Sequence, residues 1–194
     1  MIERPLLSII FEDEYLVAVD KPAGLPSQPT VDNKRPDLFT QLKKQLSSQE
    51  IFLHHRLDKD TTGVVLFSKR KSINGALTEM FRQHQFTKTY CALAKNNSAE
   101  DKSFSEKIKN GWSIQNHIIA RRKNGSSVKM FRTESGGDHA LTDFKILAQS
   151  PEALWIQAQP QTGRTHQIRV HLLHSGHPIL GDSLYGGKDS RVPR

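Results

Sequence analysis

Short apolar runs of strand length, each closed by turn-forming or charged residues, constrain the fold of this chain more than any other feature. The first two, in "LSIIFEDEYLVAVDKP", are separated by the acidic cluster Glu12–Glu14 and end at Pro22, which predicts a hairpin. Later runs predict strands over 64–68, 87–95, 140–148 and 154–159, with turns over 60–63 and 150–153. Runs joined by such short turns favour antiparallel pairing.

Three segments are expected to be helices. Asp37 can cap a helix that runs to about Ser48, because Leu38, Phe39, Leu42 and Leu46 then share one side. Residues 71–85 form the clearest amphipathic pattern and should pack on the sheet, with the apolar positions Ile73, Ala76, Leu77, Met80 and Phe81. A third helix is expected from Thr165 to Gly176.

This order of elements predicts an α+β fold, a largely antiparallel central sheet with flanking helices, and not a doubly wound parallel sheet. The 194 residues contain no internal repeat and no convincing linker, so one domain over 1–194 is expected. A composition of 36% apolar and 25% charged residues excludes a disordered chain. No apolar run approaches the roughly 18 residues of a membrane-spanning helix, and the N-terminus lacks an export signal, so a cytoplasmic protein is expected.

Two features concern partners and reactivity. The lone Cys91 lies in an alternating segment, where a small buried thiol is expected instead of a nucleophile. The net charge of +8 favours a polyanionic partner. Between Asn97 and Ser135, eight Lys/Arg stand against four Asp/Glu, with Phe104, Trp112 and Phe131 among them and an Asn-Gly turn at 124–125. This pattern fits a nucleic-acid strand, but it fits a solvated loop equally well.

The first constellation with chemical potential is "HHRLDKDTTG", residues 54–63. Asp58 lies between Arg56 and Lys59, and a cation within hydrogen-bonding distance lowers a carboxylate pKa by about 1–3 units. An ionised carboxylate can act as a nucleophile or a base, and the turn before the next strand would place it on a fixed loop. An Asp that caps its own turn beside a surface arginine explains the same letters.

The second constellation is "QTGRTHQIRVHLLHSG", residues 161–176. Arg164 and Arg169 stand among His166, His171 and His174 without one acidic residue. Cations at a helix start oppose the helix dipole, which suggests a bound anion or a compensating carboxylate elsewhere in the fold. A solvated basic face that buries Ile168, Leu172 and Leu173 is the structural alternative. A metal site is not expected here, because no carboxylate lies at ligand spacing from the candidate ligands His171, His174 and His177.

Four stretches together resemble the RluA-type pseudouridine synthases. "HHRLDKDTTG" resembles that family's H-R-L-D-x-x-T-S-G signature, and "TGRTHQIRVHLLHSGHPILGDSLYG" is similar to its second block almost residue for residue. "FTKTYCAL" resembles its tyrosine-bearing strand, and "VDKPAGLPSQP" resembles its N-terminal loop. The likeness runs from about Ser8 to Gly187, and four motifs in order are more specific than any one of them.

The resemblance implies a pseudouridine synthase fold with an active-site cleft across the sheet, and an enzyme that isomerises uridine in structured RNA without a cofactor or metal. Asp58 matches the family's catalytic aspartate, Tyr90 the tyrosine against the base, and Arg164 the basic residue paired with the aspartate. Arg56 matches an arginine that enters the space of the flipped base, and Leu180 an apolar residue packed under the catalytic group. His55, Thr62 and Arg169 complete the residues expected to contact RNA.

The resemblance also sets limits. Thr62 stands where the family usually has Ser, which keeps the hydroxyl group and should change little. Relatives usually continue past "LYGG…PR" into further strands, which this sequence, ending at Arg194, does not contain. The N-terminal RNA-binding domain of some relatives is absent as well, so the catalytic domain is expected to select a tRNA or rRNA stem-loop, as a monomer. A non-catalytic RNA-binding or RNA-chaperone protein on the same fold is the alternative, and a His-dependent metallohydrolase is a third.

Overall fold

The structure is a computed structural model that describes residues 6–32, 35–47, 50–97, 111–121 and 128–186. The chain divides into two compact units, unit 1 over 1–86 and unit 2 over 87–194. Each unit has its own antiparallel sheet and its own buried apolar residues. The α+β class predicted from the sequence is confirmed, although the strands form two sheets. The single domain over 1–194 stays a prediction.

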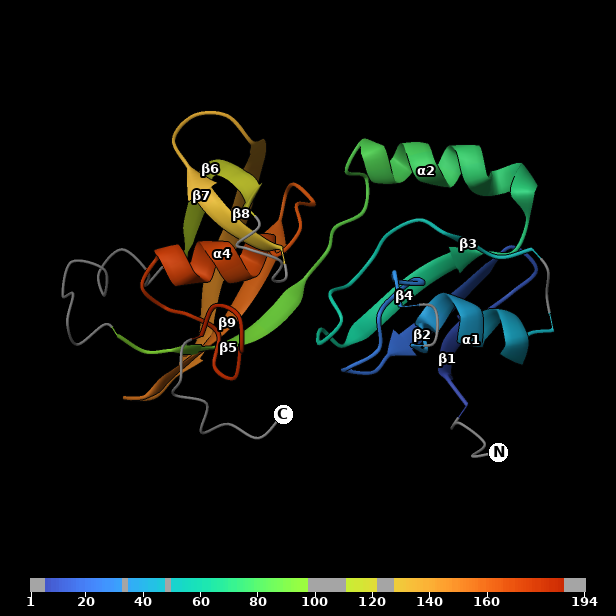
Figure 1. Cartoon of the computed structure of the whole chain (residues 1–194), viewed down its shortest axis with the longest axis horizontal. Coiled ribbons are helices and arrows are strands. Elements are labelled where there is room, and N and C mark those ends of the chain that lie inside the picture. Colours follow the sequence, from blue (N-terminus) through green and yellow to red (C-terminus); the bar gives the residue numbers. More distant parts are fainter. Residues whose placement is uncertain (1–5, 33–34, 48–49, 98–110, 122–127, 187–194) are drawn as a thin grey trace. The chain divides into compact units, whose positions relative to one another are not determined.

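Unit 1 contains a four-stranded sheet in the order β1-β2-β4-β3 (Figure 1). Its strands are β1 (Ser8–Glu12), β2 (Leu16–Lys21), β3 (Phe52–Leu53) and β4 (Gly63–Ser68), and every pair is antiparallel. The predicted hairpin is β1–β2, and the predicted strand after the Asp60–Gly63 turn is β4. Both predictions are confirmed.

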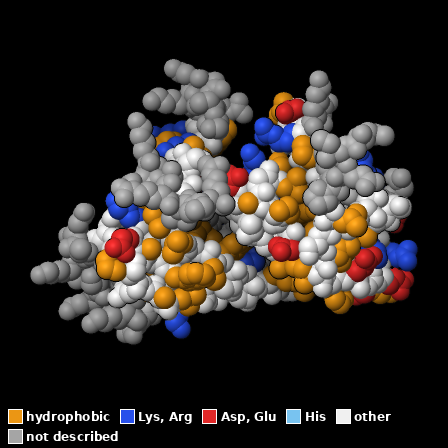
Figure 2. Space-filling model, turned by 90° about the horizontal axis from the view of Figure 1, so that it is seen from below, with side chains coloured by type: hydrophobic (Ala, Val, Ile, Leu, Met, Phe, Trp, Pro, Cys, Tyr) orange, Lys and Arg blue, Asp and Glu red, His pale blue; other side chains and the backbone are white. Residues whose placement is uncertain are grey.

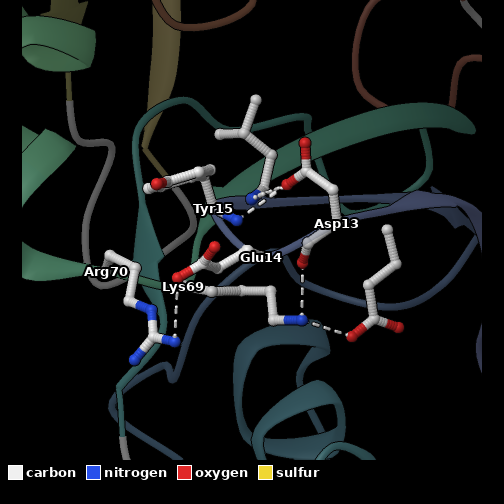
Figure 3. Close-up of polar contacts among 7 residues, drawn as sticks. Asp13, Glu14, Tyr15, Lys69 and Arg70 are labelled. Atoms are coloured by element: carbon white, nitrogen blue, oxygen red, sulfur yellow. Dashed lines mark hydrogen bonds and ion pairs between the residues drawn. The ribbon is translucent and has the colours of Figure 1, made fainter.

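The acidic cluster between β1 and β2 forms a tight turn that is tied to the end of β4 (Figure 3). The Asp13 carboxylate accepts hydrogen bonds from the backbone N–H groups of Tyr15 and Leu16, both at 2.7 Å. Lys69 Nζ donates to the Asp13 carbonyl at 2.8 Å and to Glu12 Oε1 at 2.6 Å. The Asp13 side chain therefore caps the turn by accepting its backbone N–H groups, and Lys69 holds the turn against the end of β4.

Alternation along β2 and β4 builds the core of unit 1. Val17 and Val19 on β2 pair with Phe67 and Val65 on β4, and all four side chains are fully buried. Helix α1 (Leu38–Gln45) covers this face with Leu38 and Leu42, which are also fully buried.

The start of α1 is set by its predicted cap, since the Asp37 carboxylate accepts a hydrogen bond from Thr40 N at 2.9 Å. The helix ends at Gln45, three residues before the predicted Ser48.

The amphipathic segment 71–85 begins as a 3₁₀ turn, η1 (Lys71–Ile73), and continues as α2 (Asn74–Arg82). Of its apolar residues only Leu77 is buried. Phe81 stacks on the rings of His54 and His55, and Asn74 accepts a hydrogen bond from Ser68 Oγ at the end of β4. The helix therefore reaches the sheet mainly through polar and aromatic contacts, and not through the broad apolar face that was predicted.

Unit 2 contains a five-stranded antiparallel sheet in the order β5-β9-β8-β6-β7 (Figure 1). Its strands are β5 (Tyr90–Lys95), β6 (Trp112–Arg121), β7 (Lys129–Thr133), β8 (Asp138–Gln149) and β9 (Ala153–Pro160). Strands β6 and β7 form a hairpin, as predicted, while its Asn124–Gly125 turn lies outside the described residues. The predicted 87–95, 140–148 and 154–159 strands are β5, β8 and β9.

Helix α4 (Gln167–His174) packs on this sheet and buries Val170, His171 and Leu172. The predicted helix began at Thr165, but His166 adopts a left-handed conformation with φ 57°, so regular helix starts at Gln167, two residues later than predicted. Gly176, with φ 82°, follows the helix end as predicted, because glycine tolerates the left-handed conformation common there.

The expectation that Cys91 is buried is wrong, because its side chain is exposed. Tyr90, Ala92 and Ala94 face the apolar cluster of unit 2, so Cys91 faces the opposite side of β5, beside Gln157. Both faces of this strand carry small or apolar residues, and alternation alone does not identify the inner one.

A lysine, Lys21, is the most unusual buried residue of unit 1, with no exposed surface. Its ammonium donates to three backbone carbonyls, those of Pro22 at 2.9 Å, Leu25 at 2.8 Å and Lys59 at 2.9 Å. Burial lowers its pKa to about 8, against the opposing effect of the Asp60 and Asp58 carboxylates. Lys21 remains a cation at neutral pH, and its three donors join two loops.

We expect Lys21→Met to lower the free energy of unfolding by about 3 kcal/mol, because three backbone carbonyls lose a charged donor. The difference from wild type should grow as the pH rises from about 8 to 10.5, since a lysine in the unfolded chain is still protonated where folded Lys21 is not. Below pH 8 it should be constant. Urea unfolding at pH 7 and pH 10 measures both effects, with Lys145→Met, an exposed position on β8, as control. Equal stability of Lys21→Met and wild type would contradict the anchoring role.

Candidate active site

In unit 1 the segment 54–62, between β3 and β4, carries the predicted catalytic carboxylate, Asp58. The Asp58 side chain is half-buried, and its carbonyl accepts a hydrogen bond from Thr61 N at 3.1 Å, which closes a turn. Arg56 and Thr62 are exposed on the same segment. The sequence prediction of an accessible carboxylate on a fixed loop therefore agrees with this local structure.

Side chains from another loop brace this segment immediately beside Asp58. Ser27, only 4% exposed, donates from Oγ to the Leu57 carbonyl at 2.9 Å and accepts from Leu57 N at 3.1 Å. Lys21 holds the Lys59 carbonyl on the other side of Asp58. The residues before and after Asp58 are thus both fixed by buried groups, and the sequence analysis assigned no role to Ser27 or Lys21.

Two histidines fasten the beginning of the segment. His55 Nε2 accepts a hydrogen bond from the backbone N–H of Leu66 at 3.0 Å, and its ring stacks on Phe81 at a centroid distance of 5.0 Å. His54 Nε2 lies 2.8 Å from Ser68 Oγ, and burial lowers the His54 pKa. His55 was predicted to contact RNA, but here one of its nitrogens is a partner for the edge of β4. Contact of this residue with RNA stays a prediction.

In unit 2 the predicted tyrosine, Tyr90, is the first residue of β5. It pairs with Ala158 on β9 and packs, half-buried, against the apolar cluster of this unit. Lys88, two residues earlier, is also half-buried, and burial lowers its pKa. Its Nζ lies 3.7 Å from the position that a Cβ on Gly163 would occupy, so it reaches the residue next to Arg164. The sequence analysis did not single out this lysine.

Arg164 lies three residues before α4, and not at the opening of the helix as predicted. Its side chain is 41% exposed, Nε donates to the His139 carbonyl at 2.9 Å, and Nη1 lies 4.0 Å from Asp138 Oδ1. Such a long and exposed ion pair adds little stability. The Arg164 guanidinium is therefore directed by the start of β8 without being enclosed there.

Arg169 has a different environment. It forms a two-point ion pair with Asp182, at 2.7 Å from Nε and 3.0 Å from Nη2, and Asp182 is only 5% exposed. Burial raises the Asp182 pKa, but the Arg169 hydrogen bonds and the backbone N–H groups of Tyr185 and Leu184 outweigh this and hold the pKa below its ordinary value. Asp182 is the compensating carboxylate that the sequence suggested. Contact of Arg169 with RNA stays a prediction.

Leu180 lies in the loop after α4, close to that ion pair in sequence. It is half-buried, and its N–H donates to the Leu93 carbonyl on β5 at 2.8 Å. This bond and the bridge between Ala94 and Ile179 attach the loop to the edge of the sheet. Leu180 is thus held on unit 2, together with Tyr90 and Arg164.

The histidines of the second block do not form a metal site. Both ring nitrogens of His171 have protein partners, Thr142 Oγ1 at 3.0 Å and Asn116 Oδ1 at 3.1 Å. His177 Nδ1 lies 3.0 Å from the Lys95 carbonyl. Within the part of the chain that the structure describes, no group of three or more His, Cys, Asp or Glu side chains could hold a metal ion.

The aromatic residues of the basic segment 97–135 serve different purposes. Trp112 stacks on Phe144 at 5.1 Å and packs, half-buried, against the apolar cluster. Phe131 lies between Arg121 and Lys129, each 5.8 Å from the ring centroid. Phe104 lies outside the described residues.

The two units thus present complementary chemical groups. Unit 1 holds the Asp58 carboxylate on a braced loop, and unit 2 holds the Tyr90 phenol and the Arg164 guanidinium. A carboxylate can act as a base or nucleophile, and a guanidinium can stabilise a negative charge. The predicted pairing of Asp58 with Arg164 joins the two units and stays a prediction.

Comparison with known proteins places these groups within one family. Residues 15–174 match the family model described as RNA pseudouridylate synthase. The chain is 32% identical over 97% of its length to an uncharacterized RNA pseudouridine synthase of Bacillus subtilis (strain 168), of which it covers 60%. It is 30% identical over 96% of its length to tRNA pseudouridine synthase C of Pectobacterium carotovorum subsp. carotovorum, of which it covers 50%. The chain therefore spans between a half and three fifths of these curated relatives.

The structural comparison agrees with the sequence comparison. The solved structure of human RNA pseudouridylate synthase domain containing 4 superposes with a TM-score of 0.71 and 27% sequence identity, covering 96% of this chain and 72% of that one. Asp58, Tyr90 and Arg164 all lie inside the region that matches the family model. Because that region takes in most of the chain, the protein belongs to the RNA pseudouridylate synthase family.

Proposed function

We propose that this protein is an enzyme that isomerises specific uridines in structured RNA, a tRNA or rRNA stem-loop, to pseudouridine. The observation that carries the proposal is the family match over residues 15–174. Asp58, Tyr90 and Arg164 lie within this range, and their roles are proposed from the sequence resemblance. The Pectobacterium relative is named as a tRNA-modifying enzyme, which favours tRNA as the first substrate to test.

The proposed reaction changes connectivity and not composition. The N1–C1′ bond of uridine breaks, the base turns, and a C5–C1′ bond forms; the C5 proton leaves and N1 takes up a proton. A stacked uridine is inaccessible to protein groups, so the nucleotide has to be everted at a cost of a few kcal/mol. The exposed Arg56, on the same segment as Asp58, is proposed to occupy the space that the base leaves.

Asp58 is proposed as the essential group, acting by attack at C1′, by attack at C6 or by removal of a sugar proton. Arg164 is proposed to keep it ionised, because a pair at about 4 Å gains roughly 4 kcal/mol at an effective dielectric of 20 before desolvation. Tyr90 is proposed to lie against the base and assist loss of the C5 proton, and Leu180 to exclude water under the catalytic group. His55, Thr62 and Arg169 are proposed to support RNA binding.

RNA binding is proposed to depend on local groups as well as on the net charge of +8. Among the described residues visible in Figure 2, Lys and Arg side chains are scattered, with acidic side chains on the same face and larger hydrophobic patches. No helix in the described ranges has the length and apolar character needed to cross a membrane. We propose a monomer that acts in the cytoplasm without a cofactor.

Release of tritium from RNA labelled with [5-³H]uridine tests the function directly. The enzyme should release tritium from a tRNA transcript in proportion to the pseudouridine formed. A non-catalytic RNA-binding protein would bind the same transcript with the same salt dependence and release none. Absence of release from total tRNA and from rRNA would refute the proposed activity.

We predict that Asp58→Asn lowers the rate of tritium release by at least about 10³-fold, because the neutral amide cannot supply the carboxylate. RNA affinity should change by less than about threefold, since the variant keeps the shape of the side chain. Gel-shift and single-turnover assays on one transcript measure the two effects. Asp60→Asn, on the exposed neighbour two residues away, is the matched control. Appreciable turnover by Asp58→Asn would remove Asp58 from its assigned role.

Arg164→Met should also reduce turnover, by about 10²–10³-fold, since a methionine retains the bulk but not the charge that stabilises the carboxylate. The melting temperature should stay close to wild type because the ion pair of Arg164 with Asp138 is long and exposed. Arg82→Met, which removes an exposed ion pair with Glu79, serves as control. A wild-type rate in Arg164→Met would show that the guanidinium is not needed.

A further inference from the structure

Gln167, the first residue of α4, is 4% exposed and uses every hydrogen-bonding position of its amide. Its Oε1 accepts from Arg164 N at 3.0 Å and from Thr162 Oγ1 at 2.7 Å. Its Nε2 donates to the Leu141 carbonyl at 2.9 Å and to Thr142 Oγ1 at 2.8 Å. One side chain therefore connects the loop before α4 with the centre of β8.

The connection continues through His171 to β6. His171 Nε2 lies 3.1 Å from Asn116 Oδ1, an acceptor, so this nitrogen carries the proton and Nδ1 is left to accept. Thr142 Oγ1 accepts from Gln167, so its hydroxyl proton is available to His171 Nδ1 at 3.0 Å. Burial, with a smaller effect of His174, lowers the His171 pKa to about 4, which keeps the ring neutral at pH 7.

The hydrogen bonds of this side-chain network all have a defined direction. On the other side of Gln167, Thr162 Oγ1 accepts from Leu141 N at 3.0 Å, so its own proton is free to be donated to Gln167 Oε1. Each proton in the network has one acceptor, and two donors never face each other. Gln167, Thr142 and His171 are buried, while Thr162 and Asn116 are half-buried. Satisfied hydrogen bonds among the three buried side chains make this part rigid, whereas one missing donor there leaves buried groups without partners.

The side-chain network ends at Arg164, where Gln167 binds both the backbone N–H and the backbone carbonyl. The Arg164 N–H is held by Gln167 Oε1, and the Arg164 carbonyl accepts from Gln167 N at 3.1 Å. Only the Arg164 side chain reaches outward, toward His139 and Asp138. The backbone from which the guanidinium starts is thus fixed to the sheet, although the guanidinium itself is exposed.

We propose that Gln167 is a positioning residue for Arg164, and that the hydrogen-bonded network Asn116–His171–Thr142–Gln167–Thr162 sets the direction in which the Arg164 guanidinium is presented. This inference rests on the proposed function, because it assigns the rate of that reaction to the placement of Arg164. A misplacement of about 1 Å can cost on the order of 10²-fold in rate.

The sharpest variant is Gln167→Glu, because protonation switches it between two hydrogen-bonding patterns. As a carboxylate, the new side chain opposes the Leu141 carbonyl; as a carboxylic acid it can donate to that carbonyl and accept from Arg164 N. Burial raises the pKa of a carboxyl group at this position. The titratable or charged groups around it are His171 on α4 and Arg164 in the loop before it. Its other hydrogen-bond partners, Thr162 in that loop and Leu141 and Thr142 on β8, are neutral.

Turnover of Gln167→Glu relative to wild type should therefore be lowest at pH 8 and should rise by about tenfold toward pH 5.5, where the introduced group is protonated and His171 is still neutral. The loss should be in kcat, with KM for the RNA within about threefold of wild type. Gln149→Glu, at the exposed end of β8, is the matched control and should follow the wild-type pH profile. A pH-independent ratio for Gln167→Glu would overturn the proposal.

A second pair of variants is designed to avoid a failure to fold. Thr162→Val removes the hydroxyl group between Leu141 N and Gln167 Oε1, and Thr162→Ser restores it. We expect Thr162→Val to lose about tenfold or more in kcat and Thr162→Ser to recover wild-type turnover. Equal turnover of the two would overturn the proposal, because the hydroxyl group would then be dispensable. Inactivity of the wild-type protein would refute the proposed function and the inference that rests on it, whereas an active wild type with unaffected variants would refute the inference alone.

Discussion

The candidate site of unit 1 depends most on the hydrogen bonds that the Lys21 ammonium donates to three backbone carbonyls. These carbonyls come from two irregular loops; the bond to Leu25 is buried, and those to Pro22 and Lys59 are partly buried. A buried carbonyl without a donor costs about 1–3 kcal/mol, so the cation stabilises the close approach of the two loops. Ser27 adds a donor and an acceptor to Leu57, and Asp58 then stands between two fixed residues.

In unit 2, a neutral side chain supports the irregular backbone beside the candidate residue. Arg164, like Asp58, lies on irregular backbone next to a regular element, and Gln167 supplies both the acceptor and the donor that this backbone needs. A cation in that place would repel the Arg164 guanidinium, and a carboxylate would attract it inward, whereas an amide does neither. The choice of residue type at each support therefore agrees with the charge of the group it supports: a cation behind the proposed carboxylate, and an uncharged amide behind the proposed guanidinium.

The sequence predicted the elements well where local patterns determine them. Short apolar runs closed by turn-forming or charged residues identified β2 and β4, and the Asp37 cap and apolar spacing identified α1. It failed on Cys91, since both faces of β5 carry small or apolar residues and burial depends on which face α4 covers. The candidate catalytic residues came from a resemblance to a family and not from spacing. Their supports were missed because the partners are distant in the chain: Lys59 is 38 residues from Lys21, Leu57 is 30 from Ser27, and Thr142 is 25 from Gln167.

Arg164 and Arg169, the two arginines of residues 161–176, have different environments although they are the same residue type. Arg169 lies on the helix and forms a close two-point pair with Asp182, whose carboxylate is nearly inaccessible to water, so breaking that pair would strand a buried charge. Arg164 has a hydrogen bond to the His139 carbonyl and a long, exposed ion pair with Asp138, which can be exchanged for another anion at little cost. Of the two, therefore, Arg164 is the arginine that we propose to pair with the Asp58 carboxylate. Its fixed backbone lets the guanidinium form that pair without loss of position.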